Sequence, residues 1–192
     1  MAEQSSGITL AQAQRLVQRY TPGYQVERQL AAGNFGRVYL ARDELKEVAI
    51  KILPIAFRTA GGNAANAPLA NRDWRRLIAS TDRLHHPSLV RVRDYFQCSV
   101  DDFTSPVASY GLIYMDYWPM NLRGCVYALR DQQRLTAVRR LQLLANLAPV
   151  VYCLRRDTGL LVTDLKPSNI LARDCLDGPM TLTVGDLGAL HR

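Results

Sequence analysis

The sequence predicts an α+β protein in two lobes, and three observations support this prediction. Stretches with the alternating pattern of β-strands fill the first part of the chain, with one helical stretch among them. Stretches with the helical period of about 3.6 residues follow. The length of 192 residues suits one domain, or two small lobes that share a core. Strands followed by helices are typical of an α+β architecture, here with a cleft between the lobes.

The chain is expected to open with a short amphipathic helix. Thr9 is followed three residues later by Gln12, which is the pattern of a capping box. Apolar residues then recur at helical spacing until residues 21–23, Thr-Pro-Gly, end the pattern: Leu10, Ala13, Leu16, Val17 and Tyr20. We interpret residues 1–23 as an N-terminal helical arm. Packing against the rest of the protein is favoured over a regulatory role.

Five antiparallel strands are expected in the next part of the chain, residues 24–116. Two of them are joined by a glycine turn, and the others are short apolar or alternating runs: VERQLAAGNFGRVYLAR, EVAIKIL, LVRVRDYF and SYGLIYMDY. Residues 57–73 are rich in Gly, Asn and Ala and are interpreted as a loop. A helix is expected from Asp73 to Leu84, because His86-Pro87 then breaks the pattern.

The last part of the chain, residues 117–192, is expected to be mainly helical. One helix is predicted within residues 121–135, and a longer one from Ala137 to Arg156. One face of the longer helix is predicted to carry Val138, Leu141, Leu144, Leu147, Val151 and Leu154. Two short apolar segments follow, and each ends at a loop that bears an aspartate.

Composition and charge narrow the classes of function. The net charge is +7, from 24 basic and 17 acidic residues. The basic residues are 21 arginines and three lysines, and the arginines are spread over helical stretches, which favours a solvated basic surface over nucleic-acid binding. No apolar run is long enough to cross a membrane, and the N-terminus lacks the pattern of a secretory signal, so a cytoplasmic protein is expected. The four cysteines are widely scattered and are interpreted as reduced thiols.

Two motifs in the strand region suggest a phosphate ligand. In AAGNFGRVY, Gly33 and Gly36 allow the backbone to come close to a polyphosphate, although glycines at a hairpin more often serve only the turn. In VAIK, Lys51 lies in an otherwise apolar strand, where a cation needs an anionic partner. That partner is either a nucleotide phosphate or a structural carboxylate.

Two further motifs point to phosphoryl transfer. Within six residues, DLKPSNIL supplies a carboxylate, an ammonium group and an amide oxygen, from Asp164, Lys166 and Asn169. In VGDLG, Asp186 follows an apolar segment and Gly188 allows a sharp turn, so a hard oxygen ligand for magnesium is expected there.

In this order the four motifs resemble those of the eukaryotic-type protein-kinase family, and the resemblance covers residues 24–189. It implies a kinase-like fold with a five-stranded antiparallel N-lobe, residues 24–116, and a reduced helical C-lobe, residues 117–192. Residues 86–90, HPSLV, are similar to the family's segment before the fourth strand, and LIYMDYWPMNL looks like its hinge.

The resemblance also implies a role for each site residue. Gly33, Gly36 and Lys51 would hold the phosphates of ATP, and Asn169 and Asp186 would hold Mg²⁺. Asp164 would orient the attacking hydroxyl, and Lys166 would neutralise the γ-phosphate. The adenine site would consist of a gatekeeper, two backbone contacts and three apolar side chains around the base: Met115, Asp116, Trp118, Val38, Ala49 and Leu171.

The sequence departs from the family pattern in five places. The first loop glycine is Ala31, and Leu77 stands where the family has a helical glutamate, so Asp73 is the substitute partner expected for Lys51. Val162-Thr163 replaces the His-Arg before the catalytic aspartate, and Leu187 replaces Phe in the metal motif. The sequence ends three residues after Ala189, so a minimal kinase domain without the activation segment and most of the C-lobe is expected.

The resemblance therefore implies a Ser/Thr protein kinase that uses Mg²⁺-ATP and acts on a protein. The alternative is a pseudokinase, a nucleotide-binding or interaction module that contacts a regulatory partner. Minimal kinase domains of this kind occur among bacterial effector proteins, and the arginine-rich, lysine-poor chain suits such an origin.

Overall fold

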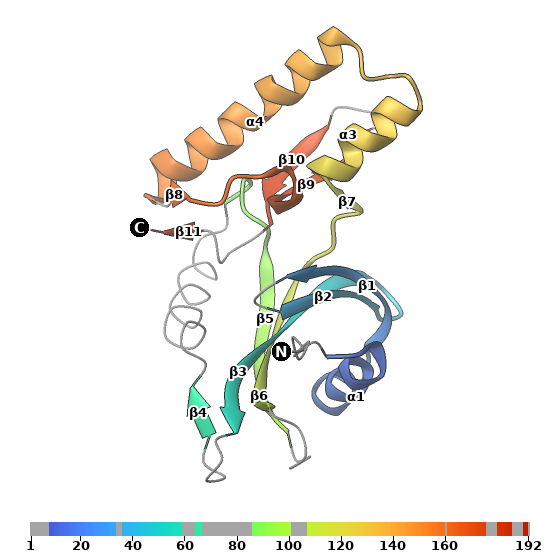
Figure 1. Cartoon of the computed structure of the whole chain (residues 1–192), viewed down its shortest axis with the longest axis vertical. Helices are drawn as coiled ribbons and strands as arrows, with labels where there is room; N and C mark the ends of the chain where they lie inside the picture. Colours follow the sequence, from blue (N-terminus) through green and yellow to red (C-terminus); the bar gives the residue numbers. More distant parts are fainter. Residues whose placement is uncertain are drawn as a thin grey trace, which may run out of the picture. The chain divides into compact units, whose positions relative to one another are not determined.

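The computed structural model describes residues 8–33, 36–58, 64–66, 86–100, 107–159, 161–175, 180–185 and 190–191. The chain divides into two units (Figure 1). Unit 1 contains Met1–Ser80 and Val92–Tyr117, and unit 2 contains Thr81–Arg91 and Trp118–Arg192. The expected helix from Asp73 to Leu84 lies outside the described residues.

Unit 1 is built on an antiparallel sheet in the order β1-β2-β3-β6-β5. Its elements, in chain order, are α1 (Leu10–Tyr20), β1 (Gln25–Gly33), β2 (Gly36–Arg42), β3 (Glu47–Arg58), β4 (Ala64–Asn66), β5 (Val92–Ser99) and β6 (Val107–Asp116). The predicted five-stranded antiparallel sheet and the α+β class are therefore confirmed.

The structure corrects the predicted loop at residues 57–73 in part. β3 continues to Arg58, and the short strand β4 pairs with its end, Ala56 opposite Asn66. The reason is tertiary packing, because Ile55 and Ala56 are buried and the end of β3 pairs with β6 on its other edge. Long-range pairing of this kind overrides a local composition that is typical of loops.

One face of the sheet carries the core of unit 1, and α1 covers that face (Figure 1). Ala13 and Val17 of α1 are fully buried against alternate residues of the strands: Tyr39, Ala41, Val48, Ile50, Ile52, Tyr110, Leu112 and Tyr114. The capping box of Thr9 and Gln12 is present. The Tyr39 hydroxyl donates to the carbonyl of Ile8 at 2.6 Å, so α1 is also held by hydrogen bonds.

The described part of unit 2 contains two α-helices, of 10 and 22 residues, and several short strands. Its elements are β7 (Met120–Asn121), α3 (Leu122–Asp131), α4 (Ala137–Thr158), β8 (Leu161–Val162), the 3₁₀ turn η1 (Pro167–Asn169), β9 (Ile170–Arg173), β10 (Thr181–Val184) and β11 (Leu190–His191). The strands form two antiparallel sheets, β10-β9-β7 and β11-β8. Thr136 caps α4 at its start, and Gly159 ends it in the left-handed conformation, with φ of 73°.

The predicted apolar face of α4 is wrong in part. The buried residues are Leu143, Val150 and Leu154, whereas Val138, Leu141 and Leu144 are exposed. A step of three residues turns about 300° around the helix axis, which is about 60° less than a full turn. Apolar residues that recur at every third position therefore drift around the helix and do not stay on one face. The helix is therefore apolar on two opposite sides, and the described residues of unit 2 bury only one of them.

Two further features follow from the described residues. None of their helices is long and apolar enough to cross a membrane. The four cysteines are free thiols, as predicted, and Cys98, Cys125 and Cys175 are buried.

Candidate functional site

Three of the predicted site residues form one cluster in unit 2. The Nζ atom of Lys166 lies 2.5 Å from Oδ2 of Asp164. The side-chain amide of Asn169 donates to the same Oδ2 atom and to the backbone carbonyl of Asp164, both at 3.0 Å. The loop from 164 to 169 is therefore folded back on its aspartate, and the carboxylate receives hydrogen bonds from a cation and an amide.

Local sequence explains this geometry. Pro167 occupies the first turn of η1, where its fixed φ suits a helical start, and the Asn169 N–H donates to the Lys166 carbonyl at 2.9 Å. This turn brings Asn169 back toward Asp164. Asn169 is 9% exposed, whereas the side chains of Asp164 and Lys166 are each 52% exposed. The amide is thus a fixed support, and the two charged groups are accessible.

The electrostatics of the cluster favour an ionised carboxylate. The hydrogen bond from Lys166 is the main cause that lowers the pKa of Asp164 below its ordinary value. Partial desolvation opposes it, while the positive charge of Lys166 and the hydrogen bond from Asn169 add to it. At neutral pH, Asp164 is therefore a hydrogen-bond acceptor.

Asn169 also holds the backbone at Gly185, within the VGDLG motif. Its backbone carbonyl accepts from the Gly185 N–H at 2.8 Å. A Cβ atom on Gly185 would lie 2.5 Å from Cγ of Leu171, so Leu171 packs directly on this glycine. Leu171 and the residue before Asp186 are thus held together, while Asp186 itself lies outside the described residues.

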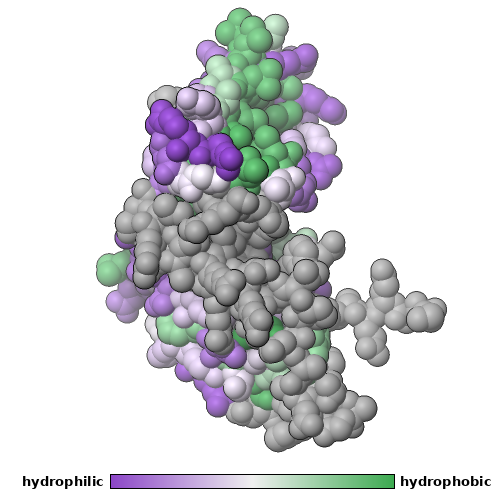
Figure 2. Space-filling view, turned by 90° about the vertical axis from the view of Figure 1, so that its left-hand side faces the viewer, coloured by the Kyte–Doolittle hydropathy of each residue, from purple (hydrophilic) through white to green (hydrophobic). Residues whose placement is uncertain are grey.

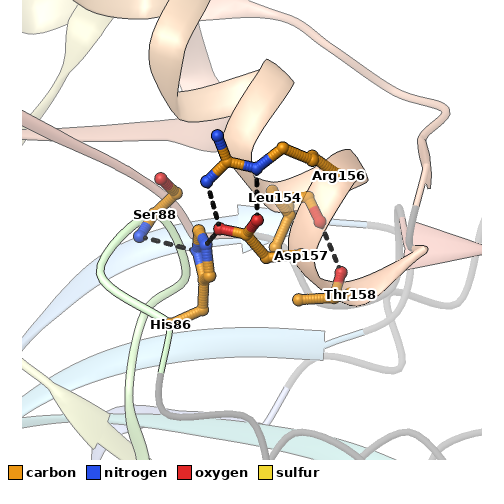
Figure 3. Close-up of polar contacts among 6 residues, drawn as sticks. All are labelled: His86, Ser88, Leu154, Arg156, Asp157 and Thr158. Carbon is orange, nitrogen blue, oxygen red and sulfur yellow. Dashed lines mark hydrogen bonds and ion pairs between the residues drawn. The ribbon is translucent and has the colours of Figure 1, made fainter.

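A second polar cluster in unit 2 was not predicted from the sequence (Figure 3). The Nε2 atom of His86 lies 3.1 Å from Oδ2 of Asp157, and the Ser88 N–H donates to Nδ1 of the same ring at 3.1 Å. Nδ1 is therefore the acceptor, and Nε2 carries the proton given to Asp157. Arg156 pairs with the same carboxylate at 2.5 Å. The cluster joins segment 86–90 to the end of α4.

Segment 86–90 in turn supports β10. The Val90 N–H donates to the Val184 carbonyl, and the Val184 N–H donates to the Ser88 carbonyl, each at 2.9 Å. In the sequence, His86-Pro87 was noted as the end of a helix and as part of a family-like segment. Asp157 lies 71 residues further along the chain, and nothing in the sequence indicated its contact with His86.

In unit 1, four predicted nucleotide-binding residues lie on one face of the sheet. Val38 is the cross-strand partner of Lys51, and Ala49 is the partner of Met115. Side chains alternate along strands, and Tyr39, Val48, Ile50 and Tyr114 belong to the core under α1. Val38, Ala49, Lys51 and Met115 therefore lie on the opposite face, where one ammonium group stands among apolar side chains.

The two loop glycines differ in what requires them. Gly36 has φ of +146°, and a Cβ atom there would lie 2.3 Å from the carbonyl oxygen of Ile52. The packing of β2 on β3 therefore demands glycine at this position. Gly33 pairs with Gly36 across the turn, and a Cβ atom there would meet only the Gly36 oxygen, at 4.0 Å.

The two predicted hinge residues have well-defined side-chain partners. Arg93 pairs with Asp116 at 2.5 Å within unit 1. In unit 2, the guanidinium of Arg173 lies 4.4 Å from the centroid of the Trp118 ring, in cation–π geometry. Leu171 and Arg173 are two residues apart on β9, so their side chains lie on the same side of that strand. The sequence gave no indication of Arg173.

The predicted site residues thus form two groups, one in each unit. Gly33, Gly36, Val38, Ala49, Lys51, Met115 and Asp116 lie in unit 1, and Trp118, Asp164, Lys166, Asn169 and Leu171 lie in unit 2. Asp73 and Leu77, like Asp186, lie outside the described residues.

Each group, taken by itself, has chemistry that suits one part of a metal-bound nucleotide. An apolar sheet face that carries a single lysine suits a planar base followed by phosphates. Both side-chain hydrogen bonds of Asn169 are made through its amide nitrogen, which leaves its oxygen as a hard ligand of the kind that Mg²⁺ prefers. Among the described residues, no three His, Cys, Asp or Glu side chains gather as a metal site.

Comparison with known proteins finds distant similarity to kinases. The chain is 27% identical over 175 residues to serine/threonine-protein kinase ssp1 of Schizosaccharomyces pombe, covering 90% of this chain and 25% of that protein. It is 28% identical over 178 residues to a G-type lectin S-receptor-like serine/threonine-protein kinase of Arabidopsis thaliana, covering 90% of this chain and 19% of that protein.

A third relative, a putative L-type lectin-domain containing receptor kinase of Arabidopsis thaliana, is 27% identical over 172 residues, which cover 88% of this chain and 22% of the relative. No protein-family model matches the sequence. The chain spans about a fifth to a quarter of the length of these curated relatives. Over most of its length, the chain is therefore distantly similar to protein kinases.

Proposed function

We propose that this chain is a kinase-like domain that binds Mg²⁺-ATP and transfers the γ-phosphoryl group to a Ser or Thr hydroxyl of a protein. The observation that carries the proposal is the cluster around Asp164, whose carboxylate accepts hydrogen bonds from both Lys166 and Asn169. Few reactions need a carboxylate, an ammonium group and a metal-binding amide within one short loop.

Each residue of this loop has a distinct task in the proposal. The ionised Asp164 accepts the proton of the substrate hydroxyl and orients that oxygen for attack. Lys166 is half exposed next to Asp164, so its ammonium group can stabilise negative charge that develops on the transferred group. Asn169 keeps Asp164 in place and offers its side-chain oxygen to a metal ion, with Asp186 as the second ligand.

The residues of unit 1 would bind the nucleotide. When bound, Mg²⁺-ATP supplies the phosphoryl group and a divalent charge that offsets the charge of the phosphates. Lys51 pairs with the phosphates, and Val38, Ala49 and Met115 contact the base. The resemblance to kinases also assigns adenine contacts to the backbone of Asp116 in unit 1 and, in unit 2, to Leu171 and the backbone of Trp118.

A pseudokinase is the second candidate, and two observations favour it. Gly36 is required by the backbone of β3 alone, so this glycine does not by itself indicate a phosphate. Leu77 stands where a catalytic kinase is expected to have a glutamate partner for Lys51. Such a module would bind a nucleotide or a partner protein without transferring phosphate.

Incubation with γ-labelled ATP, Mg²⁺ and a cell lysate distinguishes the two candidates. Asp164→Asn keeps the shape of the side chain but removes the base, so label transfer should fall by about 10²- to 10⁴-fold while nucleotide binding persists. Asp174→Asn is the matched control, because it is the same change in the same unit at a left-handed position that Asn also tolerates.

The outcomes separate the proposals clearly. Transfer by the wild type and the Asp174→Asn variant, but not by the Asp164→Asn variant, supports the kinase. Nucleotide binding with no transfer by any of the three proteins supports the pseudokinase. Equal transfer by all three would contradict the role assigned to Asp164.

A further inference from the structure

α4 has an apolar face that none of the described residues of its own unit covers. Leu143, Val150 and Leu154 are buried on one side of this helix. On the opposite side lie residues at helical spacing whose larger members are about two-thirds exposed: Val138, Leu141, Leu144, Ala145, Ala148, Pro149 and Tyr152. We call these seven residues the α4 outer face. Figure 2 shows a hydrophobic area on unit 2 with hydrophilic side chains at its borders.

The α4 outer face is long enough along the helix axis to bind a second helix. From Val138 to Tyr152 the helix rises about 21 Å, which corresponds to about four turns of a partner helix. Single exposed apolar residues are ordinary on a protein surface, whereas a continuous stripe of this length marks an interaction site. Residues three and four apart along such a stripe form the ridges into which the side chains of a second helix pack.

The charges around the α4 outer face are almost all positive. Three arginines of α4 lie beside it, namely Arg140, Arg155 and Arg156, and the one acidic residue of the helix is Asp157. That aspartate is already paired with Arg156 and His86. Arg139 is on the buried side of the helix, where it donates to the carbonyl of Cys175 at 2.6 Å. Arg140 and Arg155 are exposed. A partner helix with acidic residues beside its apolar stripe would therefore match this surface in both hydrophobicity and charge.

The same charges disfavour a second copy of this chain. In an antiparallel pair of α4 helices, Arg140 of one copy would face Arg155 and Arg156 of the other. In a parallel pair, each arginine would lie near its own counterpart. Either arrangement brings like charges together across the interface.

A lipid surface suits this face less well because of Pro149. Proline has no N–H group, so the carbonyl of Ala145 lacks its regular helical donor, and both residues lie in the middle of the α4 outer face. A lipid acyl chain offers no donor to such a carbonyl, whereas a side chain of a protein partner can supply one.

We propose that the α4 outer face is a docking surface for an acidic amphipathic helix of a partner protein. The proposal does not depend on nucleotide binding or phosphoryl transfer, because none of the residues assigned to those activities lies on α4. The apolar stripe would provide the affinity, and the arginines would select an acidic partner over a basic one.

A selection with displayed peptides tests this proposal. The library contains helices of about 18 residues, spanning about 27 Å, with a fixed leucine stripe and flanking positions that vary among Glu, Gln and Lys. The full chain is the target. Recovered peptides should be strongly enriched in Glu, and the best of them, labelled with a fluorophore, should bind with a Kd in the micromolar range.

Variants then locate the binding site. The double variant Leu141→Gln, Tyr152→Gln should weaken binding of the selected peptide by about tenfold or more, because it removes the largest exposed apolar groups. Arg140→Gln should weaken it less and should reduce its salt dependence. Leu45→Gln is the control, since Leu45 is 94% exposed in unit 1, outside the α4 outer face, and it should leave the Kd unchanged.

Four results would overturn the proposal. The first is a selection that yields no binder, or binders without a preference for Glu. The second is binding that the double variant does not weaken. The third is sedimentation showing a dimer of the chain that the double variant dissociates, which would assign the face to a second copy. The fourth is binding to phosphatidylserine vesicles that the double variant abolishes, which would assign it to a lipid surface.

Discussion

His86 and Asp157 lie 3.1 Å apart, Nε2 to Oδ2, so that segment 86–90 is tied to the C-terminal end of α4 (Figure 3). The same segment pairs with β10 through Ser88 and Val90. Since β10 leads to Gly185, a chain of contacts connects α4 with the approach to the VGDLG motif. The His86–Asp157 pair therefore supports the part of unit 2 that is expected to carry a metal ligand.

The first prediction is a pH dependence of stability through Asp157. Hydrogen bonds from Arg156 and then from His86 lower the pKa of this carboxyl to about 2. A carboxyl with a depressed folded pKa stabilises the protein above its unfolded pKa of about 4, and this contribution is lost as pH falls toward the folded value. Urea unfolding should therefore show a deficit for Asp157→Asn above about pH 4 that shrinks progressively toward pH 2.

The control for this prediction is Asp131→Asn, because Asp131 is an exposed residue at the end of α3 in the same unit. Its stability should differ little from that of the wild type at every pH. A deficit for Asp157→Asn of equal size at pH 2 and pH 6 would contradict the assigned role of the charge.

The second prediction concerns the loop glycines. Gly36→Ala places a methyl group 2.3 Å from the Ile52 carbonyl at φ of +146°, so it should destabilise the fold by about 2 kcal/mol or more. Gly33→Ala meets no close neighbour and should cost well under half as much. Thermal unfolding of the two variants measures the difference. Equal stability of both would mean that the backbone of β3 does not constrain Gly36.

Several of these features could be predicted from the sequence, because they depend on local periodicity. The alternation within VAIK placed Ala49 and Lys51 on one face of their strand, and the spacing of DLKPSNIL brought Asn169 back to Asp164. Both follow from strand geometry and a turn that begins with proline. The five-stranded sheet likewise followed from runs of alternating residues.

Features that depend on distant contacts could not be predicted. β3 extends to Arg58 because its end pairs with β6, far along the chain, and Asp157 meets His86 from 71 residues away. The stack of Arg173 on Trp118 is likewise tertiary. Leu141 illustrates a third limit, because periodicity identifies an apolar residue on a helix but not which of two apolar sides the protein covers.

The third prediction is that Arg173 holds the Trp118 ring. A cation–π contact at 4.4 Å should contribute about 0.5–1 kcal/mol at an exposed site. A double-mutant cycle with Arg173→Gln and Trp118→Leu isolates this term from other effects of either change. Arg123 and Tyr127, at 6.0 Å, provide a comparison pair on α3, and their coupling should be smaller. Coupling near zero for Arg173 and Trp118 would contradict the assignment.

The final prediction tests the role of Lys51 in nucleotide binding. If Lys51 pairs with phosphates, Mg²⁺-ATP at about 100 times its Kd should stabilise the wild type by about 2.7 kcal/mol, and Lys51→Met should lose most of this gain at the same concentration. Methionine fills the apolar part of the same space, so the variant without ligand should remain close to the wild type in stability. Lys46→Met, at the turn before β3, is the matched control, because it removes the same charge from the same unit and should keep the full stabilisation by ATP.

An equal response of all three proteins would show that ATP, if it binds, does so away from the sheet face that carries Val38, Ala49, Lys51 and Met115. Absence of any response in the wild type would exclude both the kinase and the nucleotide-binding pseudokinase, and would leave the α4 outer face as the surface on which to seek a function.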